Sequence, residues 1–143
     1  MSEEENKAAA RSFFEEVWNK ANVGQADAFL APEFVSHNSM GFTIKTVDDY
    51  RRGVLSYRAA FPDHVTTVED VIAEGDRVVV RGTDRGTQLG EFMGQPARGR
   101  TVTSTWIEIF RMESGRAVEG WVETDTRVLL GQLTSESPSR GQE

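Results

Sequence analysis

The sequence predicts an α+β domain in which helices come first and a mostly antiparallel sheet follows. Apolar residues recur at helical spacing through the first 62 residues. After Pro62, runs rich in Val, Thr, Ile and Phe alternate with turn residues, as in strands joined by hairpins. Strands and helices do not alternate in the way that builds a parallel sheet, so the helices are expected together on one face of the sheet.

Three helices are expected before Pro62. The first begins at Ser2 and Glu5, which have the spacing of a capping box, and runs for about five turns. A short second helix is expected over residues 25–30, and a third over residues 46–61. Each of these two is followed by a proline, which cannot continue a helix.

The pattern of the second half of the chain predicts four strands that form two hairpins. They are expected over residues 64–73, 77–87, 100–112 and 116–124. The segment 88–99 carries three glycines and a proline, so it is expected to be a rim or lid loop. A short helix over 128–133 closes the domain, which is predicted to span residues 1–133. Residues 134–143 lack large apolar side chains and are predicted to form a disordered tail.

The predicted strands carry apolar residues on both faces. Val102, Trp106 and Phe110 point one way in the third strand, whereas Ile107 and Ile109 point the other. A sheet with one face in water would alternate between apolar and polar residues. We therefore expect the helices on one face and a second copy of the chain on the other, in a homodimer or homotetramer.

Composition narrows the classes of function. The 143 residues include 16 Lys and Arg against 23 Asp and Glu, a net charge of −7, which disfavours nucleic acid as a partner. The chain has no cysteine, which excludes disulfides and thiolate chemistry, and its two histidines lack metal-ligand spacing. No apolar run approaches the roughly 20 residues of a membrane helix. No membrane partner is expected, and the acidic first residues favour a cytoplasmic location over a secretory signal.

Several runs give the chain a family resemblance. They lie at residues 13–20 (FFEEVWNK), 31–38 (APEFVSHN), 61–63 (FPD), 90–94 (GEFMG) and 109–111 (IFR), and end with Trp121 and Asp125. In order and spacing, the sequence from Ala8 to Leu133 resembles the SnoaL-like polyketide cyclase (ester cyclase) family.

The resemblance implies the nuclear-transport-factor-2-like fold, a cone in which a curved sheet wraps around helices and encloses an apolar pocket. Founding members close the last ring of aromatic polyketides by an intramolecular aldol condensation, without metal or cofactor. Their acid/base is an aspartate late in the final strand, a role that the motif Trp-x-x-x-Asp would give to Asp125.

The sequence also departs from the common family pattern. Gly120 stands where many members have a histidine, Gly82 where a bulky aromatic residue is frequent, and Trp106 where glycine is frequent. These exchanges would reshape the pocket.

Two residues are candidates for catalysis. Asp125 could move a proton in a dry cavity, or it could simply cap the closing helix by accepting a hydrogen bond from a backbone amide. His37 could shuttle a proton or donate to a ligand carbonyl, or it could be a loop histidine bonded to backbone carbonyls. His64 is expected to be exposed.

Five further residues are candidates for substrate binding. Trp18, Trp106 and Trp121 offer flat rings to an aromatic or polycyclic ligand, although such residues more often form the core. Asn38 could stabilise oxygen charge. Arg81 could pair with Asp125 or orient an oxyanion, or it could lie on an exposed edge or in a dimer interface.

The leading functional hypothesis is a cofactor-independent cyclase, isomerase or hydrolase that acts on a small hydrophobic carbonyl compound. A second is a non-catalytic dimeric protein that binds a hydrophobic metabolite. A third is water addition to an epoxide, which would need Glu119 or Glu123 to converge with Arg81 and Asp125.

Overall fold

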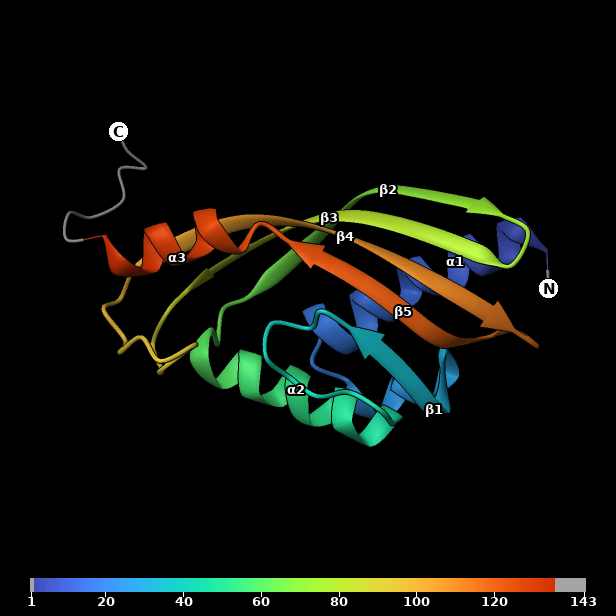
Figure 1. Ribbon diagram of the computed structural model, residues 1–143, viewed down its shortest axis with the longest axis horizontal. Helices are drawn as coiled ribbons and strands as arrows, with labels where there is room; N and C mark the ends of the chain where they lie inside the picture. The colour runs from blue at the N-terminus through green and yellow to red at the C-terminus, as the bar shows by residue number, and fades with distance from the viewer. Residues whose placement is uncertain (1, 136–143) are drawn as a thin grey trace.

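Five strands form one curved sheet in the computed structural model, which describes residues 2–135. Their order is β1-β5-β4-β3-β2 (Figure 1). The bounds are β1 Leu30–His37, β2 Val65–Glu74, β3 Arg77–Thr87, β4 Thr101–Glu113 and β5 Arg116–Thr124. Strands β2 to β5 pair antiparallel, as predicted, and the α+β class is confirmed.

Strand β1 was not expected. The structure replaces the predicted helix at 25–30 with a 3₁₀-helix, η2 (Val23–Ala28), followed by β1, which pairs parallel with β5. Strand β1 lies at the edge of the sheet and pairs with a strand on one side only. Such a strand tolerates Pro32, which has no N–H to donate to a neighbouring strand. The register also shifts between Leu30 and Val35, so the strand has no regular alternation to read.

The first helix is regular only in its first part. Helix α1 (Glu3–Phe13) begins with the predicted capping box, in which the Glu5 amide donates to Ser2 Oγ at 3.0 Å and the Ser2 amide donates to Glu5 Oε1 at 2.9 Å. The chain then continues as a π-helix, η1 (Phe14–Asn19), where we expected an unbroken α-helix.

The other helices lie close to their predicted positions. Helix α2 (Val47–Ala60) is capped by Thr46 Oγ1, which accepts from the Asp49 amide at 3.0 Å. Helices α1 and α2 lie on one side of the sheet, and α3 (Thr126–Thr134) follows β5 at one end of the molecule (Figure 1). Thr134 ends α3, and the rest of the predicted tail after Ser135 lies outside the described residues. No helix within residues 2–135 is long and apolar enough to cross a membrane.

Strand β4 shows how the sheet divides its side chains. From Val102 to Met112, every even-numbered residue is buried, whereas Ile107 and Ile109 are 47% and 36% exposed on the opposite face. The register aligns even with even across β3, β4 and β5, as in Gly82 opposite Trp106, except beyond a register shift between Arg111 and Met112. These even-numbered side chains therefore share the helix-covered face, which is here called the inner face.

Candidate active site

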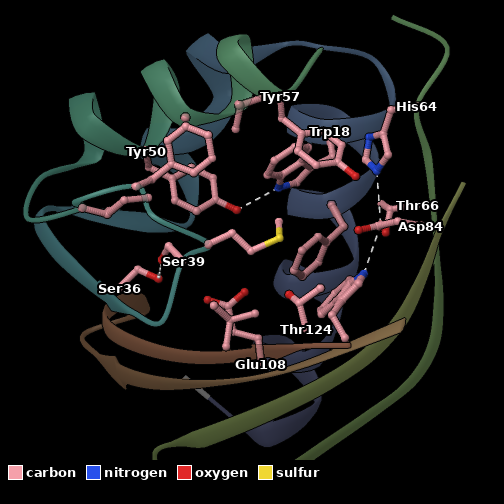
Figure 2. Close-up of a pocket in the computed structure, with 18 residues that line it drawn as sticks. Trp18, Ser36, Ser39, Tyr50, Tyr57, His64, Thr66, Asp84, Glu108 and Thr124 are labelled. Atoms are coloured by element: carbon pink, nitrogen blue, oxygen red, sulfur yellow. Dashed lines mark hydrogen bonds and ion pairs between the residues drawn. The ribbon is translucent and has the colours of Figure 1, made fainter. Parts of the chain in front are cut away.

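A cavity of about 100 Å³ lies between the inner face of the sheet, η1 and α2 (Figure 2). Its walls are mostly aromatic and aliphatic, including Phe14, Tyr57 and Trp106. The loop between β1 and α2 adds Met40 and Phe42, which are only half-buried, so the cavity reaches the surface along this loop. An apolar hollow with a few polar groups is the usual form of a small-molecule site.

Glu108 brings a deeply buried carboxyl group to this cavity. It projects from the inner face of β4, is 4% exposed, and its Oε2 has no hydrogen-bond partner among the described residues. Burial without a compensating charge disfavours the ionised form and raises the pKa of Glu108 to about 8. Glu108 therefore carries a proton at neutral pH and can donate it.

Gly120 on β5 makes room for that carboxyl group. A Cβ at this position would lie 2.8 Å from Glu108 Oε2 and 3.0 Å from Phe34 Cζ. Any larger side chain at position 120 would displace Glu108 or Phe34, so this glycine positions the carboxyl group.

A second polar cluster lies on another wall, where Asp84 and His64 approach each other (Figure 2). Trp106 is the third member of this cluster. Trp106 Nε1 donates to Asp84 Oδ1 at 3.1 Å, and His64 Nε2 lies 3.1 Å from the same oxygen. The His64 approach lacks hydrogen-bond geometry, and within residues 2–135 neither ring nitrogen has a hydrogen-bond partner. The imidazole is instead packed edge-on against Trp18 and Tyr57.

Tyr50 supplies a hydroxyl to the same cavity. Its oxygen accepts from Trp18 Nε1 at 2.7 Å. Burial raises the pKa of Tyr50 well above its ordinary value, with a smaller contribution from Glu108, so the phenol stays protonated. The hydroxyl hydrogen remains available to a ligand oxygen.

Two of the seven predicted site residues line this cavity, namely Trp18 and Trp106. The structure does not bring the other five there. His37, Asn38, Arg81, Trp121 and Asp125 belong to the opposite face of the sheet or to strand ends. The physical reason is the two-residue period of a strand: if Val122 and Thr124 face the cavity, Trp121 must face away.

Asp125 adopts the capping alternative. Its Oδ1 accepts from the Val128 amide at 3.2 Å at the start of α3, and the residue is exposed. An exposed cap is not the dry carboxyl group that the acid/base role requires, so the geometry does not support that role.

His37 and Trp121 form part of an outer-face network. The two rings stack with centroids 5.6 Å apart, and His37 Nε2 lies 2.8 Å from Glu119 Oε2. Arg111 also donates to Glu119, at 3.2 Å and 3.3 Å. The hydrogen bond from His37, followed by those from Arg111, lowers the pKa of Glu119. The Arg77 guanidinium lies over the Trp121 ring, with its Cζ 5.2 Å from the ring centroid.

The residues of the epoxide hypothesis also meet on the outer face. Arg81, Glu123 and Asp125 line a shallow hollow of about 370 Å³. Arg81 is already paired with Asp70 at 2.7 Å, and Glu123 accepts from Asn38 Nδ2 at 2.7 Å. Each of the three is exposed, so none is held in the dry surroundings that would activate a water molecule. This arrangement does not support water addition to an epoxide.

Glu108, Asp84 and His64 were not predicted as site residues. Glu108 could have been found, because it shares the parity of Val102, Trp106 and Phe110, which were already assigned to one face. The expectation that His64 is exposed is wrong, since it is 3% exposed. The Trp18 ring that packs against His64 comes from a helix far away in sequence, so no local pattern reveals this contact.

Comparison with known proteins identifies the family. The model of the SnoaL-like polyketide cyclases matches residues 8–133. The chain belongs to this family. It resembles TsrD from Streptomyces laurentii, with 28% identity and a TM-score of 0.81, over 90% of this chain and 96% of that one. It also resembles IdmH from Streptomyces antibioticus, a candidate polyketide cyclase, with 29% identity and a TM-score of 0.77, over 90% and 99% of the two chains. No curated protein matches.

Another similar structure has a different proposed chemistry. AclR from Streptomyces galilaeus, a candidate hydroxylase, shares 29% identity and a TM-score of 0.79 over 92% of this chain and 97% of that one. These likenesses, together with the sheet topology, confirm the predicted SnoaL-like membership and the nuclear-transport-factor-2-like fold.

Replacing Asp125 with alanine should lower the free energy of unfolding by about 1 kcal/mol, because the Val128 amide loses its cap. Urea unfolding at pH 7 measures this change. Asp125→Asn retains a capping oxygen and should be close to the native protein. A loss of several kcal/mol in the free energy of unfolding, seen in both Asp125→Ala and Asp125→Asn, would contradict a simple capping role.

The buried carboxyl group should make stability depend on pH. Glu108 ionises near its ordinary pKa in the unfolded chain but only near pH 8 in the folded one, so the folded state binds more protons between these values. The free energy of unfolding should therefore fall as pH rises from about 5 to 8, by on the order of 4 kcal/mol relative to Glu108→Gln. Urea unfolding across this range checks the difference, and parallel curves for the two proteins would contradict it.

Proposed function

We propose that this chain is a cofactor-independent acid/base enzyme that acts on a small, hydrophobic, polyketide-like carbonyl compound, as an aldol cyclase or a related isomerase. The observation that carries the proposal is Glu108, a carboxyl group held protonated in an apolar cavity that reaches the surface. Membership of the SnoaL-like polyketide cyclase family supports the reaction class. We expect the enzyme to work in the cytoplasm.

The reaction begins with enolisation. The Asp84 carboxylate removes a proton from the carbon next to the substrate carbonyl, while Glu108 gives its proton to the carbonyl oxygen. The product is a neutral enol, with Asp84 protonated and Glu108 ionised. A neutral acid paired with a carboxylate base in one cavity is suited to this step.

Cyclisation then restores both groups. The enol carbon bonds to a second carbonyl carbon of the same molecule, and the enol oxygen returns its proton to Glu108 as the first carbonyl re-forms. The new alkoxide takes the proton held by Asp84. No atom is gained or lost, so neither a metal nor a cofactor is required for the balance.

The surrounding groups orient the substrate. Trp106 Nε1 donates to Asp84 and fixes the base, and the Tyr50 hydroxyl can donate to a substrate oxygen. The aromatic walls exclude water, which strengthens each of these interactions.

Deuterium exchange tests the proposal without knowledge of the natural substrate. Acetophenone incubated with the protein in D₂O should exchange its methyl hydrogens faster than in buffer, as measured by proton NMR. Glu108→Gln should slow the protein-dependent exchange by about 100-fold or more, because it keeps the shape but cannot protonate the carbonyl.

Glu123→Gln is the matched control, since Glu123 is an exposed carboxylate on the outer face. It should leave the exchange rate unchanged. If Glu108→Gln still exchanges the methyl hydrogens of acetophenone at the native rate, Glu108 is not the acid/base group. A native protein that binds acetophenone without exchanging its hydrogens would instead be a non-catalytic binding protein.

We also infer that the outer face packs against a second copy of the chain, as a homodimer or within a homotetramer. On this face, Ile72 of β2 is 62% exposed, and Ile107 and Ile109 of β4 are 47% and 36% exposed. Val79 of β3 lies between Ile72 and Ile109 in the strand register. Burial of such aliphatic side chains against the same face of a second copy removes them from water on both chains.

Sedimentation velocity should show a species of two or four times 15.9 kDa. Ile107→Lys should shift the protein toward the monomer, because a charge in the interface would lose its water. Leu55→Lys, which alters an exposed leucine on α2, should leave the assembly unchanged. A native protein that sediments as a monomer would refute the interface.

A further inference from the structure

Trp106 and Gly82 form a complementary pair on the inner face of the sheet. They are opposite one another on β4 and β3, and the Trp106 indole lies over the glycine. A Cβ at position 82 would meet Trp106 Cζ2 at 2.3 Å and Cε2 at 2.5 Å, distances that no real contact adopts. The indole therefore occupies the space that a side chain at position 82 would need.

The indole is held in this place on its other sides as well. Trp106 is 6% exposed, its ring centroid lies 4.8 Å from that of Phe14, and Nε1 donates to Asp84 at 3.1 Å. A displacement of the ring would disturb both of these contacts. Trp106 is therefore a fixed wall of the cavity rather than an adaptable one.

The remaining space is small. A dry protein cavity of about 150 Å³ holds one benzene ring. The cavity beside Trp106 measures about 100 Å³, so a single aromatic ring already fills it and leaves no room for a fused second ring. The rest of a ligand must lie toward the half-buried loop that carries Met40 and Phe42.

We propose that Trp106, seated on Gly82, is a specificity-determining residue that restricts the ligand to acyclic or single-ring carbonyl compounds and excludes fused polycyclic ones. The inference rests on the cavity being the ligand site of the proposed function. It does not depend on the acid/base chemistry of Glu108, and binding alone can test it.

A series of ketones with increasing ring number provides the probes: acetophenone, 2-acetonaphthone and 2-acetylanthracene. Apolar area alone would make affinity rise along this series. NMR titration of the native protein should instead show affinity falling from the one-ring to the two-ring and three-ring ketone, because the wider rings meet the Trp106 indole.

Two variants change the wall in opposite directions. Trp106→Leu removes the ring but keeps an apolar core residue, and it should bind 2-acetonaphthone about ten-fold more tightly than the native protein, or better. Gly82→Ala drives the indole into the cavity and should weaken binding of acetophenone as well. Trp121→Leu removes a tryptophan from the outer face and should keep the native order of affinities.

Each result decides the inference. An affinity that rises with ring number in the native protein, no binding of acetophenone by it, or no gain for Trp106→Leu would overturn the proposal. A change in Trp121→Leu equal to that in Trp106→Leu would do the same. If Trp106→Leu does not fold, the native series and Gly82→Ala give the answer.

Glu108→Gln separates this proposal from the proposed function. It should keep the native order of affinities for the three ketones while losing the deuterium exchange. If the order is kept and the exchange also survives, the acid/base role fails and the size restriction stands. If the exchange is lost but the native protein binds the three-ring ketone as well as the one-ring ketone, the size restriction fails alone.

Discussion

The pairing register of β3, β4 and β5 determines which side chains can reach the cavity. Each strand sends alternate residues to opposite faces, and the register keeps the even-numbered residues of the three strands together. Glu108, Trp106 and Asp84 owe their common surroundings to this alignment. A shift of one residue in β4 would bring Ile107 and Ile109 inside and place the buried carboxyl group in solvent.

The second constraint is the energetic cost of Glu108. A carboxyl group in an apolar interior loses its hydration, and the described residues offer Oε2 no hydrogen bond in return. Protonation reduces this cost, since the neutral acid is less expensive to bury than the anion. The aromatic core that joins Phe13, Phe14, Phe29 and Phe110 must stabilise the fold enough to tolerate such a group.

Much of the fold was predictable because its signals are local. The capping box at Ser2, the helix after Thr46 and the four antiparallel strands follow from short patterns that the structure confirms. The parallel edge strand β1 escaped prediction because its partner β5 lies more than 80 residues away in sequence.

The candidate site was less predictable because it depends on which face of a strand points inward. The two-residue spacing of Glu119, Trp121 and Glu123 puts them on one face of β5, but nothing in their own pattern says that this face is the outer one. The family motif drew attention to Asp125, which in this chain caps α3, whereas the dry carboxyl group is on β4.

The π-helical turn between Phe14 and Asn19 has a consequence for how this cavity could change during evolution. A π-bulge amounts to one extra residue accommodated within an α-helix, and it turns every later side chain by about 100°. Trp18 lies within this segment and reaches Tyr50 from it. Loss of a single codon here could restore an ordinary helix and swing the indole out of the wall, so an insertion or deletion, and not only a substitution, offers a route to a new ligand.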